Sequence, residues 1–124
     1  PYVLGRLFSL LETVQDMAQP GLNSGIRDKF GNSACATPAA VFPLLLSKST
    51  YHLRKLKEGT RVYWSKQIGD LMDRLPEVFP ATLNLQEQGS FRLGYYHQTQ
   101  KRYEKRKPAD TDENTTDMED NKNV

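Results

Sequence analysis

The chain has 124 residues, of which 37% are hydrophobic and 26% are charged, and its formal net charge is +2. This length suits one domain with a modest core, and no apolar run approaches the roughly 20 residues that a transmembrane helix needs. The net charge conceals an asymmetry, because residues 1–107 hold 16 Lys and Arg against 9 Asp and Glu, whereas residues 108–124 hold one Lys against six acids. A basic body therefore precedes an acidic tail.

Helical spacing of apolar residues predicts a first helix over residues 2–17. Its apolar positions are Val3, Leu4, Leu7, Phe8, Leu11 and Val14. Its polar positions, on the opposite side, are Arg6, Ser9 and Thr13. Pro20 and Gly21 end the helix. No small-residue cleavage site follows this apolar stretch, so it does not read as a signal peptide, and we expect a cytoplasmic protein.

A short second helix and a long third helix are expected next. Asn23 or Ser24 caps the short helix, which runs through Phe30 before a Gly-Asn pair ends it. The long helix begins at Thr37, whose side chain supplies a capping oxygen ahead of a proline, and runs to about Leu56. One face of the long helix carries three residues at i, i+4 and i+7 spacing: Lys48, His52 and Lys55.

A fourth helix is predicted over residues 61–75, after a turn at residues 58–60 in which Thr60 supplies the cap. Arg61 and Lys66 extend the basic surface of the third helix beyond this turn. The apolar stripe of the fourth helix consists of Trp64, Ile68, Leu71, Met72 and Leu75.

The fifth helix is predicted over residues 85–107, because Asn84 and a glutamate three positions later form a capping-box pattern. Tyr96 shares a stripe of this helix with Gly89 and Leu93, which favours a place in the core. The composition of residues 108–124 predicts a disordered acidic tail. These elements add up to an all-α fold, a compact bundle of four long helices and one short helix forming one domain over residues 1–107.

Residues suited to catalysis are sparse. His52 and His97 lie on different helices, and no nucleotide-binding, zinc-protease or Cys-x-x-Cys motif occurs. Cys35 has no second cysteine to pair with, so a buried thiol is expected. Asp70 and Asp73 are spaced like a weak metal pair, but a solvated helix face explains them better. We therefore expect no enzyme activity, no cofactor and no metal.

The cations of the third and fourth helices are the best candidates for function. Lys48, His52, Lys55, Arg61 and Lys66 form the first group, and the second consists of Arg27 and Lys29. Positive charge presented along a surface neutralises phosphates without reading sequence, so the pattern favours nucleic-acid contact. An ordinary solvated face is the alternative.

Five segments in order carry a family resemblance: YVLGRLFSLLE, SACATPAAVFPLLL, HLRKL, IGDLMDRL and FPATLNLQEQGSFRLGYYHQTQ. Together they resemble the C-terminal region of the large subunit of type I-C CRISPR effector complexes (Cascade), which is also made as a separate small subunit. The resemblance covers about residues 2–103. It implies a non-catalytic helical subunit of a crRNA-guided surveillance complex, which stabilises the R-loop by contacting the displaced non-target DNA strand.

The partners that this resemblance implies are the backbone subunits, the large subunit, other copies of the chain and the crRNA, without a membrane. The most distinctive segment places four residues in helix packing or subunit contact: Tyr95, Tyr96, His97 and Gln98. Two alternatives stay open. In one, the basic face meets protein or crRNA-bearing subunits instead of DNA. In the other, the chain is a free-standing nucleic-acid-binding bundle.

Overall fold

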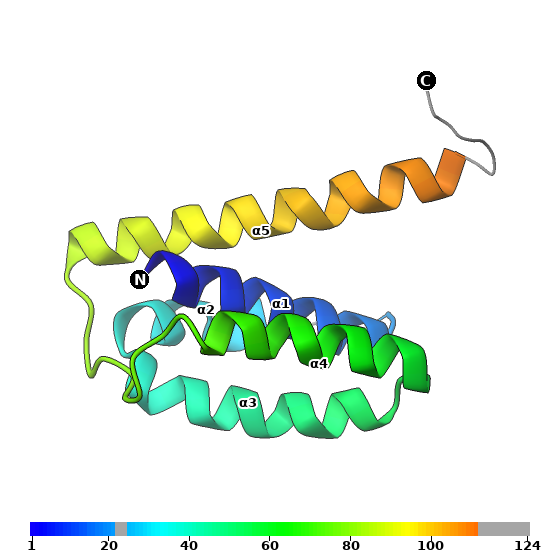
Figure 1. Cartoon of the computed structure of the whole chain (residues 1–124). Coiled ribbons are helices and arrows are strands. Elements are labelled where there is room, and N and C mark those ends of the chain that lie inside the picture. The colour runs from blue at the N-terminus through cyan, green and yellow to red at the C-terminus, as the bar shows by residue number, and fades with distance from the viewer. Residues whose placement is uncertain (22–24, 112–124) are drawn as a thin grey trace.

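The fold consists of helices throughout the part of the chain that the structure describes. The computed structural model describes residues 1–21 and 25–111, with side chains as far as residue 102. Its helices are α1 (Tyr2–Ala18), α2 (Ile26–Ala36), α3 (Pro38–Arg54), α4 (Glu58–Met72) and α5 (Leu85–Thr111), and no strand occurs in these ranges (Figure 1). The all-α prediction is confirmed. The predicted tail lies, from residue 112 onward, outside the described residues.

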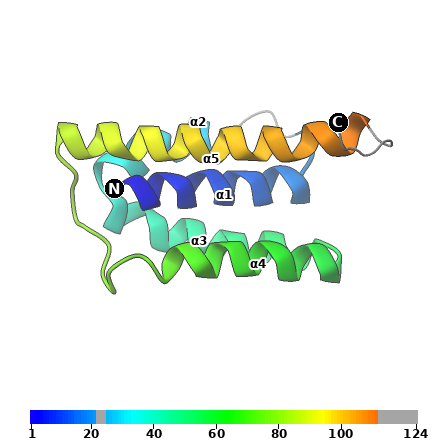
Figure 2. The ribbon, with the colours of Figure 1, turned by 45° about the horizontal axis from the view of Figure 1, so that its top comes forward.

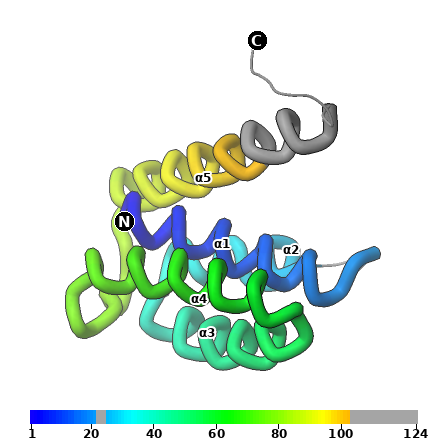
Figure 3. The backbone as a smooth tube through the Cα atoms, turned by 45° about the vertical axis from the view of Figure 1, so that its right-hand side comes forward, coloured from blue at the N-terminus to red at the C-terminus, as the bar shows by residue number. Residues whose placement is uncertain are grey.

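Helix α1 is the centre of the bundle. It lies between α5 on one side and α3 with α4 on the other (Figures 1 and 2). Its apolar side is buried, as Leu7 and Val14 illustrate at 0% exposure, but so are Ser9 and Thr13 on its polar side. The polar side is buried because α5 packs along it, as the view from another side also shows (Figure 3). A helix buried on opposite sides separates two layers of the fold.

Aromatic rings fill the space where α1, α3 and α5 meet. The ring centroids of Phe8, Phe42 and Phe91 lie 6.0–6.3 Å from one another, and the Phe42 ring stacks on Phe79 at 5.4 Å. Phe8, Phe42 and Phe91 are each at most 3% exposed. Because each buried aromatic side chain contributes about 1.5–3 kcal/mol, this cluster is a main source of the stability of the fold.

Two glycines bring α1 and α5 into backbone contact. A Cβ placed on Gly5 would lie 1.8 Å from the carbonyl oxygen of Phe91, and one placed on Gly94 would lie 2.0 Å from that of Tyr2. No larger residue fits at either position without moving a helix. Gly89, on the same helix as Gly94, makes no such contact, because nothing lies within 4 Å of a Cβ placed on it.

The second helix is longer than predicted and begins differently. It starts after Gly25, while the predicted caps Asn23 and Ser24 lie outside the described residues. It continues through Gly31 to Ala36 instead of ending at Phe30. A helical glycine costs about 1 kcal/mol. Full burial of Ala34 and Cys35 in the last turn offsets that cost.

The boundaries of α3, α4 and α5 also differ from the prediction. The Thr37 hydroxyl donates back to the carbonyl of Ser33 and does not cap α3. Helix α4 begins at Glu58, where an acidic side chain suits the positive end of the helix dipole, so residues 58–60 do not form a separate turn. Proline at 76 disfavours helical geometry at Leu75, and α4 ends at Met72. Helix α5 continues past 107 to Thr111.

The connection between α4 and α5 is fixed at both ends. The amide of Ala39 donates to the carbonyl of Pro80 at 3.0 Å, and the amide of Leu83 donates to the carbonyl of Ala36 at 3.0 Å. Asn84 and Glu87 then form the predicted capping box, because each backbone amide donates to the other's side-chain oxygen at 2.8 Å. These bonds fix the point at which α5 begins its path along α1.

Candidate nucleic-acid interface

Lys48 on α3 and Lys55, which directly follows the last residue of α3, are both exposed. Each ammonium group lies over an aromatic ring, Lys48 at 5.2 Å from the ring centroid of Phe30 and Lys55 at 4.6 Å from that of Tyr51. Cation–π contacts of this kind are worth about 0.5–1 kcal/mol at exposed sites. They hold both cations against the protein while leaving their donors available to a ligand.

His52 lies on the same helix but does not belong to the exposed surface. Its side chain is only 6% exposed, although the helical spacing places it on the same side as the two lysines. The i, i+4, i+7 spacing gives one side of the helix, but α1 and α2 cover part of that side. Neither ring nitrogen has a hydrogen-bond partner. Burial lowers the pKa of His52, and the charges of Lys55 and Lys48 lower it further.

Lys29 joins Lys48 and His52 at one pocket. The pocket has a volume of about 420 Å³ and opens between the end of α1, helix α2 and helix α3. The sequence had placed Lys29 and Lys48 in separate groups, since they belong to different helices. Packing of Phe30 beneath the Lys48 ammonium brings the two helices together. We call this the α2–α3 pocket.

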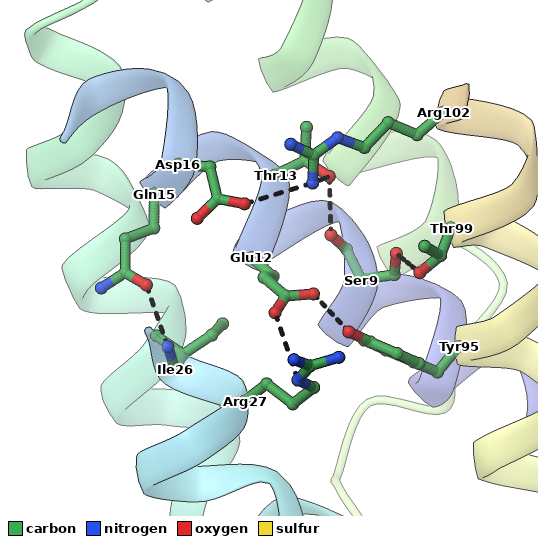
Figure 4. Close-up of polar contacts among 10 residues, drawn as sticks. All are labelled: Ser9, Glu12, Thr13, Gln15, Asp16, Ile26, Arg27, Tyr95, Thr99 and Arg102. Atoms are coloured by element: carbon green, nitrogen blue, oxygen red, sulfur yellow. Dashed lines mark hydrogen bonds and ion pairs between the residues drawn. The ribbon is translucent and has the colours of Figure 1, made fainter. Parts of the chain in front are cut away.

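The remaining walls of the α2–α3 pocket could not be predicted from the sequence. They are formed by Gln15, Gln19, Ser47 and Tyr51. Gln15 uses its side-chain oxygen to accept the amide hydrogen of Ile26 at 2.9 Å, which leaves its amide nitrogen available (Figure 4). A glutamine near the end of an amphipathic helix carries no sequence signal for such a role.

Arg27 faces another part of the bundle. Its guanidinium lies 3.9 Å from a carboxylate oxygen of Glu12, whose other oxygen accepts the Tyr95 hydroxyl at 2.5 Å (Figure 4). Arg27 and Lys29 are two positions apart on a helix and so point to nearly opposite sides. The structure thus separates the second predicted group. The nearby charges of Tyr95 and Glu12 raise the pKa of Arg27, so that cation stays fully charged.

Arg61 and Lys66 lie on α4, outside the α2–α3 pocket. Lys66 is exposed and Arg61 is half-buried. Neither is among the residues that line the pocket, so the five cations of the first predicted group do not converge on one point. Of that group, Lys48 and His52 line the pocket, and Lys55 lies at the C-terminal end of the same helix.

Three of the four residues in the distinctive segment of α5 contact α1. The Tyr2 hydroxyl and His97 Nδ1 lie 2.7 Å apart, and Arg6 Nε donates to Gln98 Oε1 at 2.9 Å. Tyr95 packs its ring 5.9 Å from that of Phe8. Burial, with the adjacent Glu12 carboxylate, raises the pKa of Tyr95 to about 12.

The fourth residue, Tyr96, points away from the bundle. It is 57% exposed, and Leu93 on the same stripe is 51% exposed, so the expected place in the core is wrong. The stripe continues to Leu85, which is 85% exposed. The prediction chose the wrong side of α5. The side that faces α1 carries Gly94 and Tyr95, and not Gly89 and Tyr96. We call Leu85, Leu93 and Tyr96 the outer stripe of α5.

Metal ligands do not gather within the described residues, where no group of three or more His, Cys, Asp or Glu side chains is close enough to hold an ion. Cys35 is fully buried, and burial raises the pKa of its thiol. Within the same residues, no helix combines the length and the apolar content needed to cross a bilayer.

Comparison with known proteins identifies a family but no individual protein. No curated protein matches the chain. A family described as CRISPR-associated protein (Cas_Csd1) matches residues 1–103, from α1 to the part of α5 that packs on it. Because the match covers more than half of the chain and spans the whole bundle, the chain belongs to the Cas_Csd1 family of CRISPR-associated proteins.

Proposed function

We propose that the chain is a non-catalytic small subunit of a type I-C CRISPR surveillance complex in the cytoplasm. In this role it packs along the backbone subunits, beside the large subunit and other copies of itself. It stabilises the R-loop through sequence-independent contacts with the displaced non-target DNA strand. Membership of the Cas_Csd1 family supports a place in CRISPR defence.

The observation that carries the DNA-binding part is the presentation of Lys48 and Lys55. Both residues are exposed, and both ammonium groups lie over aromatic rings, one on α3 and the other at its C-terminal end. No acidic residue occurs between Asp28 and Glu58, so the sequence places no opposing charge on this helix. Positive charge of this kind retains a phosphate backbone and ignores base identity, which is what a displaced strand requires.

The decisive experiment measures target-DNA affinity of the reconstituted complex across a salt series. The complex is prepared without the subunit, with the wild-type subunit, and with the Lys48→Glu, Lys55→Glu variant. Loss of two phosphate contacts is expected to lower the affinity and to reduce the salt slope by roughly 1.4, because each single-strand contact contributes about 0.7. The control is an Arg74→Glu, Lys101→Glu variant. It makes the same change in charge at one position after the end of α4 and one position on α5.

Unchanged DNA affinity in the Lys48→Glu, Lys55→Glu complex contradicts the assigned face. A second candidate function is a purely structural role, in which the basic face meets protein or crRNA-bearing subunits. The outer stripe of α5 favours it, because three large apolar side chains (Leu85, Leu93 and Tyr96) are more than half exposed there. Under that alternative, the α3 variant fails to co-purify with the complex, and charge reversal affects assembly before it affects DNA binding.

A further inference from the structure

The α2–α3 pocket combines two cations with an unsatisfied buried group. Lys29 and Lys48 supply charge from two helices, and His52 lines the same pocket. The imidazole is 6% exposed, and both of its ring nitrogens lack a hydrogen-bond partner. Buried polar groups in native proteins almost always have partners, so an exception calls for an explanation.

The protonation state of His52 determines which ligand would satisfy it. Burial and the charges of Lys55 and Lys48 favour the neutral ring, because they lower the pKa of His52. A neutral imidazole carries one N–H donor and one acceptor. The donor needs an oxygen acceptor, and the lysines on either side favour an acceptor that carries negative charge. A phosphate oxygen meets both conditions, and it also accepts from ammonium and amide groups.

We infer that the α2–α3 pocket seats one phosphate group of a single-stranded nucleic-acid backbone, bound by the ammonium groups of Lys29 and Lys48 and by the N–H donor of His52. The amide nitrogen of Gln15, which its bond to Ile26 leaves free, is positioned to act as a further donor. The inference deepens the proposed function and rests on it for the identity of the ligand. The inference adds a specific binding site for one phosphate group to a basic surface that attracts phosphates without a fixed geometry.

Entry of the phosphate requires that the ring nitrogens of His52 become accessible. The two ring nitrogens are covered in the ligand-free protein, but Lys48 and Tyr51 at the rim are exposed. Side chains of exposed residues change rotamer within nanoseconds. Movement of these two side chains is therefore part of the proposed binding.

The test uses the full chain and a fluorescently labelled oligothymidylate of about ten nucleotides, near the length that small single-strand sites cover. His52→Phe removes the donor and keeps an apolar ring of similar size, so the fold is expected to tolerate it. Lys29→Gln removes one charge from an exposed position, so it should not affect folding. It therefore still tests the site if His52→Phe unfolds. Arg74→Gln, also exposed and remote from the pocket, makes the same charge change and is the matched control.

His52→Phe is expected to weaken oligonucleotide binding about tenfold, because a hydrogen bond to a charged group contributes on that scale. Lys29→Gln is expected to weaken it severalfold, and Arg74→Gln by less than twofold. In wild type, oligonucleotide and inorganic phosphate should each shift the ring resonances of His52. The sequence contains one other histidine, so the assignment needs only a His97 variant. Phosphate alone producing the full shift identifies the phosphate group, not the base, as the ligand.

Equal losses of oligonucleotide affinity in Lys29→Gln and Arg74→Gln overturn the inference, because they indicate general electrostatic attraction without a specific phosphate-binding site. An unmoved His52 resonance at saturating oligonucleotide, or no binding by the wild-type chain at low salt, also overturns it. Failure of the proposed function looks different. In that case the isolated chain still binds through His52 and Lys29, while omission of the subunit leaves the DNA affinity of the whole complex unchanged.

Discussion

Replacing Gly94 with alanine should destabilise the protein by forcing α1 and α5 apart. The new Cβ would lie 2.0 Å from the carbonyl oxygen of Tyr2, whereas distances below 3.0 Å are essentially never seen. The two backbones must therefore separate by at least 1 Å at this point. The obstacle is backbone on both sides, so no rotamer change relieves it.

The size of the effect is a balance of two opposing terms. Overpacking of a close interface costs about 1–3 kcal/mol, and occasionally more. Alanine gains about 1 kcal/mol over glycine in a helix interior. Separation of the helices also weakens the hydrogen bonds across the interface, such as the bond of 2.9 Å between the hydroxyls of Ser9 and Thr99. We expect the free energy of unfolding to fall by about 2 kcal/mol. For a domain of this size, each kcal/mol lost lowers Tm by roughly 4–8 °C.

Urea unfolding followed by circular dichroism measures this loss, with Gly89→Ala as the control. Gly89 lies on the same helix, but nothing is within 4 Å of a Cβ placed on it, so alanine there should raise the free energy of unfolding by up to about 1 kcal/mol. The two variants should thus change stability in opposite directions. Equal stabilisation by both would refute the backbone contact between α1 and α5.

Three further predictions concern single side chains. Tyr95→Phe should flatten the alkaline stability profile: with a pKa raised to about 12, Tyr95 stabilises the fold fully below pH 10, and this stabilisation is lost as the pH rises toward 12. His52→Phe should reduce the loss of stability in acid, because the lowered pKa of His52 means that the free energy of unfolding falls as the pH drops below about 6.5. A pH series of thermal melts tests the Tyr95 and His52 predictions. Asn84→Ala should cost about 1 kcal/mol in urea unfolding by removing the capping box, and Asn32→Ala, at an exposed helical position, should cost less.

Sequence patterns were sufficient where a local interaction decides the outcome. The first helix and the Asn84–Glu87 cap follow from spacing and from a local hydrogen-bond pair, and both are present. Patterns failed where tertiary contact decides. Gly31 signals a helix end, but burial of Cys35 carries α2 past it.

The candidate site shows the same division. Helical spacing predicted that Lys48 and Lys55 share a face, and the structure shows each ammonium group over an aromatic ring. It could not reveal that α1 and α2 would cover His52 on the same side, because burial depends on where other helices pack. Nor could it bring Lys29 to Lys48, since that proximity results from the packing of α2 on α3. Spacing fixes which residues share a helix face, and tertiary packing fixes what that face meets.

The distribution of charge argues that the two sides of α1 have different tasks. Toward α5, a cation meets an acid of the same chain: Arg102 lies 3.2 Å from Asp16 of α1. That contact uses positive charge to hold α5 in place. Toward α2 and α3, the sequence from 29 to 57 has five cations and no acid. Uncompensated charge on one side of a bundle raises the cost of folding through self-repulsion. Retaining it is best explained by an anionic partner outside the chain, and the α2–α3 pocket lies on that side.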